Sequence, residues 1–188
     1  MKTKTRKYPQ FSPCGLNCGL CPRYYTKGNS RCPGCAGAGF DAVHPPCGIL
    51  SCSLRKGLEY CFLCDEFPCK KYDGADQTDS FITHKNQFRD IEKAKQMGIA
   101  AYEDELNLKI KMLEELLENY DDGRRKGLFC IAVNLLELKD VSFVMKQIKE
   151  ETTSLAELKE KAKVAARLFE ARAAELGIEL RLRKKAKG

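Results

Sequence analysis

The sequence predicts a mainly α-helical protein in two parts, an irregular cysteine-rich module at residues 11–74 and a helical bundle at residues 79–188. Ten of the eleven cysteines fall between Cys14 and Cys69, in a segment rich in glycine and proline. Beyond Gly74 the chain consists of long stretches rich in Glu, Lys, Leu and Ala, which are strong helix formers. Strand and helix patterns do not alternate along the chain, so a parallel α/β sheet is not expected.

The cysteines of the first part are spaced as ligands of metal ions. Eight of them form pairs: Cys18 with Cys21, Cys32 with Cys35, Cys61 with Cys64 and, more loosely, Cys47 with Cys52. The two-residue gap in C-x2-C lets both sulfurs face one ion, and two such pairs complete a tetrahedral zinc site. Four pairs therefore predict two structural zinc sites. Sequential and interleaved pairings satisfy this count equally.

Cys14 and Cys69 stand at the two ends of the block without a pair. They either lie beside the ligands, replace one of them, or indicate that the metal is not zinc. A four-iron, four-sulfide cluster also takes four thiolates, so it is the alternative cofactor. His44 is a further candidate ligand, although an ordinary loop histidine is the preferred interpretation. The candidate metal ligands are therefore all ten clustered cysteines: Cys14, Cys18, Cys21, Cys32, Cys35, Cys47, Cys52, Cys61, Cys64 and Cys69.

The first three cysteines also match a spacing found in enzymes. C-x3-C-x2-C, from Cys14 to Cys21, is the arrangement with which radical S-adenosylmethionine enzymes hold their cluster. Those enzymes place it in a loop of a parallel α/β barrel, and the helical pattern here does not support such a scaffold. The sequence also lacks a phosphate loop, a dinucleotide fingerprint and a Ser-His-Asp arrangement. A protein without enzymatic activity is therefore favoured.

The composition limits the location and the kinds of partner. The chain of 188 residues is 43% hydrophobic and 31% charged, which is typical of a soluble globular protein. No stretch holds the roughly 18 apolar residues that a membrane span requires, and the basic start lacks an apolar segment. A cytoplasmic protein without a membrane partner is expected. Two zinc sites of four thiolates would each add a charge of about −2, lowering the formal net charge of +7 to about +3. That charge is too small to indicate nucleic acid by itself.

Five helices are expected in the second part, from apolar stripes and from residues that start or end helices. Their ranges are 81–97, 101–120, 128–138, about 141–149, and from Thr153 or Ser154 to Gly177. Asp79 or Ser80 would cap the first helix and Gly98 would end it. The second helix carries one apolar stripe, formed by Tyr102, Leu106, Ile110, Leu113 and Leu117. Cys130 is expected to pack as a small apolar side chain. Residues 178–184 alternate apolar and charged side chains, which fits a short edge strand or an extended tail.

The cysteine-rich part carries four sequence elements in a fixed order. They are CGLNCGLCPRY at 14–24, CPGC at 32–35, CGILSC at 47–52 and YCFLCDEFPCKKY at 60–72. In these elements the chain resembles an uncharacterised cysteine-rich family of prokaryotic proteins, for which zinc binding is the expected property. The resemblance covers roughly residues 11–75. It implies metal binding and no particular activity.

The favoured function is a binding or interaction module with structural zinc, because an irregular segment of about 60 residues is too small to supply its own core. An unidentified protein is the expected partner. The alternative is an iron–sulfur protein for redox chemistry or electron transfer. Binding of nucleic acid, through stacking on the aromatic residues between the cysteines, is the weakest alternative.

Overall fold

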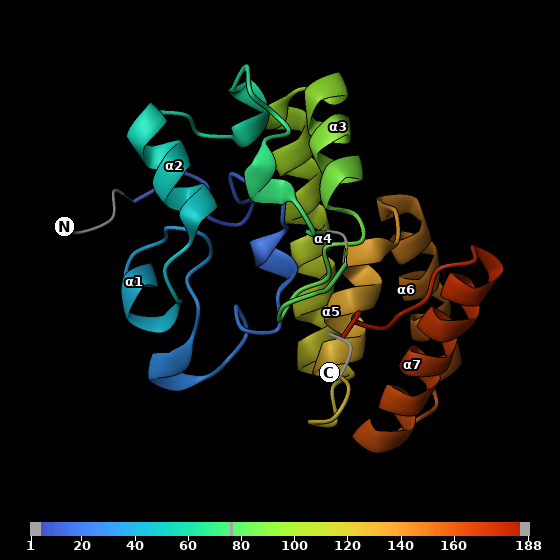
Figure 1. Ribbon diagram of the computed structural model, residues 1–188. Helices are drawn as coiled ribbons and strands as arrows, with labels where there is room; N and C mark the ends of the chain where they lie inside the picture. Colours follow the sequence, from blue (N-terminus) through green and yellow to red (C-terminus); the bar gives the residue numbers. More distant parts are fainter. Residues whose placement is uncertain (1–4, 76, 185–188) are drawn as a thin grey trace. The chain divides into compact units, whose positions relative to one another are not determined.

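The computed structural model describes residues 5–75 and 77–184 (Figure 1). Over these residues it contains seven α-helices and four short 3-10 turns, and no β-strand. The predicted fold class, mainly α with an irregular N-terminal part, is confirmed. No helix in the described ranges is long and apolar enough to cross a membrane.

The chain divides into two compact units. Among the described residues, the first comprises the chain up to Glu103 together with residues 182–184, and the second is Asp104–Arg181. The division falls inside helix α4 (Ile99–Asn119), whereas the change of composition suggested a boundary between residues 74 and 79. The difference arises because α3 (Gln87–Met97) packs against the cysteine loops. The Gln87 side chain donates to the Cys14 carbonyl at 2.7 Å.

The cysteine-rich part of the first unit consists mostly of turns. It contains 3-10 turns at Cys18–Leu20, Gly28–Ser30, Cys61–Leu63 and Lys70–Tyr72, and the short helices α1 (Phe40–Val43) and α2 (Gly48–Lys56). In Figure 1 these elements run from blue to green. Phe11 is fully buried, and its ring centroid lies 5.4 Å from that of Tyr60 and 4.7 Å from that of Tyr102. Aromatic side chains from distant parts of the sequence thus form the small core of this unit.

Helix α3 begins six residues later than the sequence predicts. The Asp79 carboxylate, expected as its cap, accepts a hydrogen bond from the His84 N–H at 2.7 Å and forms an ion pair with Arg183 at 2.8 Å. These contacts order residues 79–86 as a loop, and the helix starts at Gln87. Gly98, at φ 87°, separates α3 from α4 as expected, because that conformation favours glycine.

Helix α4 carries the predicted apolar stripe with one change. Tyr102, Leu106, Ile110 and Leu113 are buried as expected, whereas Leu116 is fully buried in place of Leu117. A straight α-helix turns about 100° per residue, so neighbouring leucines at 116 and 117 compete for the same buried face. The sequence pattern alone does not separate them.

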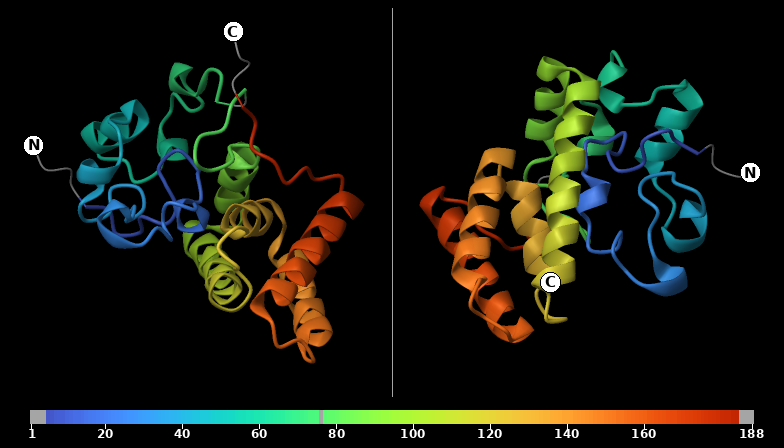
Figure 2. Two further views of the ribbon diagram at one scale, coloured as in Figure 1. Left: turned by 90° about the horizontal axis from the view of Figure 1, so that it is seen from below. Right: turned by 180° about the vertical axis from the view of Figure 1, so that it is seen from behind.

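The second unit contains α5 (Lys126–Leu135), α6 (Leu138–Thr152) and α7 (Leu158–Glu175), which pack side by side (Figure 2). The rings of Phe129 on α5 and Phe169 on α7 are both fully buried, with centroids 6.1 Å apart. Cys130 is buried in α5, in line with its expected role as a small apolar residue.

Helix boundaries in this unit differ from the sequence prediction by a few residues at both ends of each helix. The expected helix 128–138 ends at Leu135, and α6 begins at Leu138 rather than near Val141. Leu136 and Glu137 are extended and separate the two helices. α7 begins at Leu158, not at Thr153, because the Thr153 hydroxyl donates to the Lys149 carbonyl at 2.7 Å and extends the end of α6.

Residues 178–184 are irregular and make no strand pairing, and the Arg181 N–H donates to the Glu179 carbonyl at 2.9 Å, so the tail is observed and the edge strand is not. In the first unit, Arg183 is anchored on Asp79: its backbone N–H donates to one carboxylate oxygen at 2.8 Å and its guanidinium to the other.

Candidate metal centre

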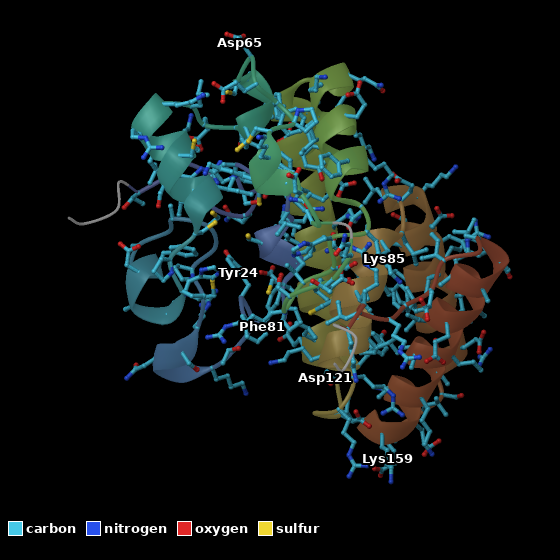
Figure 3. The ribbon with its side chains drawn as sticks, in the orientation of Figure 1. Tyr24, Asp65, Phe81, Lys85, Asp121 and Lys159 are labelled. Carbon is cyan, nitrogen blue, oxygen red and sulfur yellow. The ribbon has the colours of Figure 1, made fainter. Side chains whose placement is uncertain are left out.

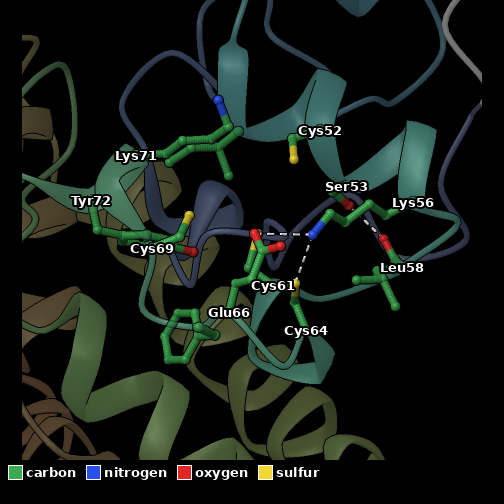
Figure 4. Close-up of a pocket in the computed structure, with 12 residues that line it drawn as sticks. Cys52, Ser53, Lys56, Leu58, Cys61, Cys64, Glu66, Cys69, Lys71 and Tyr72 are labelled. Atoms are coloured by element: carbon green, nitrogen blue, oxygen red, sulfur yellow. Dashed lines mark hydrogen bonds and ion pairs between the residues drawn. The ribbon is translucent and has the colours of Figure 1, made fainter.

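The structure distributes the ten candidate cysteines over two pockets of the first unit. Six of them, Cys14, Cys18, Cys21, Cys32, Cys35 and Cys47, line a cavity that we call the six-thiol pocket. The other four, Cys52, Cys61, Cys64 and Cys69, line a second cavity that we call the four-thiol pocket (Figure 4). None of the eleven cysteines, all of which lie in the described part of the chain, forms a disulfide bond.

Tight turns position the sulfurs of the six-thiol pocket. Cys18 opens a 3-10 turn, and the Cys21 N–H donates to its carbonyl at 3.2 Å. In the CPGC element the Cys35 N–H donates to the Pro9 carbonyl at 2.8 Å. Gly34 has φ 87°, and a Cβ there would lie 2.5 Å from the Pro9 carbonyl oxygen. Glycine is therefore required between these two cysteines by both the backbone conformation and the close approach.

Burial makes these thiols weak acids in the absence of metal. It raises the pKa of Cys14 to about 12 and that of Cys21 to about 12. The pKa of Cys18 is raised by its hydrogen bond with Cys35 and by burial. Cys18, Cys32, Cys35 and Cys47 also pack with Phe40 and Leu50 in an apolar cluster. A metal ion bound here would displace protons, because thiolates are the ligating form.

Three segments supply the sulfurs of the four-thiol pocket. Cys52 lies on α2, Cys61 and Cys64 bracket a 3-10 turn, and Cys69 precedes another. The Cys61 N–H donates to the Pro13 carbonyl at 2.9 Å, which ties this turn to the start of the module. The Cys64 N–H donates to the Cys61 carbonyl at 3.0 Å, as expected for a C-x2-C turn. Burial raises the pKa of Cys61.

Two further side chains of the four-thiol pocket lie next to its sulfurs (Figure 4). The Lys56 ammonium donates to Cys64 Sγ at 3.3 Å and lies 3.2 Å from a Glu66 carboxylate oxygen. The Tyr72 hydroxyl is buried, and burial together with the neighbouring Cys61 thiol raises its pKa. The sequence analysis missed both residues. Lys56 follows Cys52 by four residues on α2, a helical spacing that places the two on one face and was the available signal.

The pairing expected from the sequence differs from the grouping in the structure at two places. Cys47 and Cys52 line different pockets, and Cys69, which the spacing left without a pair, lies with Cys52. Cys47 immediately precedes α2 and Cys52 lies within it. Five helical residues correspond to a rotation of about 140° beyond one full turn, so the two side chains point to different sides. The pairs at 18/21, 32/35 and 61/64 each line one pocket.

The His44 ring is engaged as an ordinary loop histidine. It stacks on Phe40 with centroids 4.4 Å apart, and Nδ1 lies 2.8 Å from the Pro45 carbonyl oxygen. Phe11 and Phe40 are buried rather than available for stacking with bases. Phe81, labelled in Figure 3, is exposed, and the Arg23 guanidinium lies over its ring at 4.7 Å.

Within the described ranges, no group of three or more His, Cys, Asp or Glu side chains is arranged so that it could hold a metal ion. The thiols line the two pockets without converging on one point. The donor set nevertheless fits zinc in chemistry. Four thiolates complete one tetrahedral ion, and the four-thiol pocket contains that number.

The fold and the two pockets define a helical protein with a turn-rich N-terminal cysteine domain. Residues 10–74 match the profile of a family described as "Protein of unknown function (DUF3795)". The family resemblance indicated by the sequence elements is confirmed over these residues, and the description assigns no activity to them. No curated protein and no solved structure matches the chain.

Proposed function

We propose that the cysteine domain binds two structural zinc ions, each through four thiolates, and serves as a module that binds another protein. The observation that carries the proposal is the distribution of all ten clustered thiols over two pockets, four in one and six in the other. Zinc would here replace the apolar core that so turn-rich a segment lacks. Reduced thiols of this number fit a reducing compartment such as the cytoplasm.

The ligands of the first ion are Cys52, Cys61, Cys64 and Cys69. They are all the thiols of the four-thiol pocket, and four ligands close a structural zinc site. Zinc supplies no redox chemistry, so its contribution is to hold α2 and the turns at Cys61–Leu63 and Lys70–Tyr72 together. This assignment makes Cys69 a ligand.

Four thiols of the six-thiol pocket hold the second ion. The two C-x2-C turns supply Cys18 with Cys21 and Cys32 with Cys35, which form a complete set. Cys18 is hydrogen-bonded to Cys35, and Cys21 lies near Cys32, so the two turns face each other. In this arrangement Cys14 and Cys47 flank the site as thiols.

A binding role is supported by exposed apolar side chains at the two pockets. Leu63 lies between the ligands Cys61 and Cys64, and 55% of it is exposed. Phe81, in the lining of the six-thiol pocket, is 56% exposed. Exposed apolar side chains beside a metal-held site are suited to contact an apolar patch on a protein partner.

The proposal is tested by the metal content of protein purified without air. About two zinc ions per chain and a colourless preparation are expected. Cys69→Ser should lose one ion, whereas Cys130→Ser, which alters the buried thiol of α5, should retain both. A preparation without metal, or Cys69→Ser with two ions, would contradict the proposal.

Iron in the same preparation would favour the alternative function. Six thiols line one pocket, two more than a zinc ion requires, and a four-iron, four-sulfide cluster also takes four. A brown protein with about four irons per chain would therefore indicate redox chemistry or electron transfer.

A further inference from the structure

The Cys61 and Cys64 sulfurs of the four-thiol pocket each have a polar side chain beside them that is not a cysteine. We propose that Lys56 and Tyr72 donate hydrogen bonds to the Cys64 and Cys61 thiolates when metal is bound, and that these bonds hold the ion in this pocket. The inference rests on the proposed function, because it concerns the metal site assigned above. It adds two positioning residues that do not themselves touch the ion.

Lys56 is oriented toward the pocket from the last turn of α2. Its ammonium lies 3.3 Å from Cys64 Sγ and 3.2 Å from a Glu66 carboxylate oxygen (Figure 4). Glu66 thus holds the ammonium beside the sulfur. The Lys56 side chain is 37% exposed, so the cation remains partly hydrated and costs little to place there.

Tyr72 has a buried hydroxyl that needs an acceptor. The residue is 6% exposed, and its hydroxyl makes no hydrogen bond of ordinary geometry among the described residues. The ring is held by Phe67 at 5.2 Å and Phe88 at 5.5 Å, measured between centroids. The Cys61 and Cys69 thiols line the same pocket as Tyr72, and after burial the Cys61 thiol is the main cause that raises the pKa of Tyr72. A buried donor without a partner is unfavourable, and a thiolate at Cys61 would supply the missing acceptor.

The charge of the bound site explains why such donors matter. Four thiolates and one divalent zinc ion carry a net charge of about −2, which is unfavourable in a partly buried pocket. Hydrogen bonds from Lys56 and Tyr72 withdraw charge from the sulfurs and favour the thiolate form over the thiol. Groups that orient or hydrogen-bond metal ligands typically change metal affinity about 10- to 100-fold.

In the six-thiol pocket one polar side chain contacts a sulfur, since Ser12 Oγ lies 3.0 Å from Cys14 Sγ. The Arg23 guanidinium donates to the Val43 carbonyl at 3.3 Å and stacks on Phe81, and His44 is bonded to Pro45. Neither of these two side chains has a hydrogen bond to a sulfur within the described residues. Ser12 is a neutral group and Cys14 is not one of the ligands assigned to the second ion, so the inference concerns the four-thiol pocket, where both contacted sulfurs are assigned ligands.

The test compares Lys56→Met and Tyr72→Phe with wild type in the full chain, after zinc is replaced by cadmium-113. Cadmium resonances report thiolate hydrogen bonding at each site, and a chelator titration reports retention of each ion. We expect each variant to shift only the resonance of the four-thiol site and to weaken that ion about tenfold. Lys56→Arg, which keeps a charged donor, should restore most of the retention.

Lys71→Met is the matched control. Lys71 lines the same pocket and makes no hydrogen bond or ion pair among the described residues, so its replacement removes the same charge without touching a sulfur. The cadmium resonances of Lys71→Met and its retention of both ions should equal those of wild type. An equal loss in Lys71→Met would show that charge alone matters and would overturn the inference.

The outcomes separate the inference from the proposed function. Wild-type protein that takes up no metal contradicts the proposed function. Two bound ions in wild type, with unchanged resonances and retention in both variants, overturn the inference alone. An unchanged resonance from the six-thiol site in Tyr72→Phe shows that this variant is folded, and Lys56→Met tests the same idea independently.

Discussion

Asn17 shows how one amide within the cysteine motif connects three elements. It is 2% exposed, donates to the Asp90 carboxylate of α3 at 2.7 Å, and accepts from the Tyr102 hydroxyl of α4 at 2.9 Å. An amide is suited to this position because it both donates and accepts. A side chain of the same shape that only accepts would leave one of the two contacts unfavourable.

Asn17→Asp therefore places a carboxylate beside Asp90 in a buried site. Loss of one hydrogen bond and the new charge repulsion should lower the free energy of unfolding by about 3 kcal/mol. Urea denaturation of the metal-loaded protein measures this. The matched substitution Asn29→Asp, at an exposed residue of the same domain, should change stability by less than about 0.5 kcal/mol. Equal effects of the two would contradict the assigned role of Asn17.

Lys109 is a buried lysine in the second unit. It is 6% exposed, and its ammonium donates to the carbonyls of Asn134 at 3.2 Å and Leu136 at 2.8 Å, where α5 ends. Helix ends have carbonyls without partners in the helix, and a lysine is a favourable donor for them. The pair of bonds also fixes the extended residues between α5 and α6.

We expect Lys109→Met to destabilise the second unit by about 2 kcal/mol, because buried carbonyls lose their charged donor. Lys111→Met, at an exposed position of the same helix, serves as the control. Thermal unfolding followed by circular dichroism compares the two. A stability change in Lys111→Met as large as that in Lys109→Met would show that the buried contacts do not matter.

At the scale of elements, the C-x2-C turns depend on glycine as well as on cysteine. Gly34 has φ 87°, and a Cβ would meet the Pro9 carbonyl oxygen at 2.5 Å. Gly28 has φ 77°, but no atom lies within 4 Å of the position that a Cβ would take there. The two positions thus share the unusual backbone conformation and differ in the space around it.

The comparison of Gly34→Ala with Gly28→Ala separates these two effects. Gly28→Ala should cost about 1 kcal/mol, from backbone strain alone. Gly34→Ala should cost about 3 kcal/mol and should also weaken metal retention, because Pro9 and the CPGC turn must move apart. Denaturation and zinc release by a chelator measure both quantities. Equal stability of the two variants would contradict the steric argument.

At the scale of the molecule, the two units have cores of different kinds. The helices α5, α6 and α7 pack on one another through apolar side chains such as Val144, Ile148 and Phe169. In the first unit, turns held by a few aromatic residues surround two groups of thiols. α3 belongs to the first unit, with Ile91 packed against Gly15 of the cysteine motif.

Metal removal should therefore act unequally on the helices. A chelator is expected to abolish hydrogen-exchange protection in the cysteine domain and in α3, while α5, α6 and α7 remain protected. Amide exchange read by mass spectrometry distinguishes these segments. Protection of α3 that survives metal removal would contradict its assignment to the metal-dependent unit, and loss in α7 would show that the units unfold together.

The ion pair between Asp79 and Arg183 joins segments 104 residues apart. The Asp79 side chain is fully buried; burial alone raises its pKa, but the hydrogen bonds from Arg183 and His84 outweigh this and lower the pKa. A carboxylate whose pKa is lowered by folding contributes stability that is complete above its unfolded value, about 3.9, and is lost as the pH falls through the folded value.

Acidification below about pH 4 should release residues 182–184, and Asp79→Asn should weaken their attachment already at about pH 7. Hydrogen exchange of the segment measures both. Arg181→Gln, which removes a charge two residues before Arg183, should leave the attachment intact. Exchange that does not depend on pH between about 3 and 7, after correction for the intrinsic rate, would contradict this account.

The sequence by itself determined the features that depend on neighbouring residues. Cysteine spacing identified all ten thiols that line the two pockets, and apolar periodicity located the helices α3 to α7, with errors at their ends. The ends were misjudged where a capping side chain found a partner far along the chain, as Asp79 did with Arg183. Local pattern carries no information about such partners.

Only the tertiary structure decided which thiols lie together. Cys47 and Cys52 are near in sequence but separate because a helix turns between them, and Cys69 joins Cys52 because the chain folds back. The roles of Lys56 and Tyr72 could not be predicted from the sequence for the same reason. Both lie beside sulfurs because α2 and the turns at Cys61–Leu63 and Lys70–Tyr72 pack around one pocket. Which residues lie close in space depends on the path of the whole chain between them. The spacing of cysteines within one motif does not determine that path.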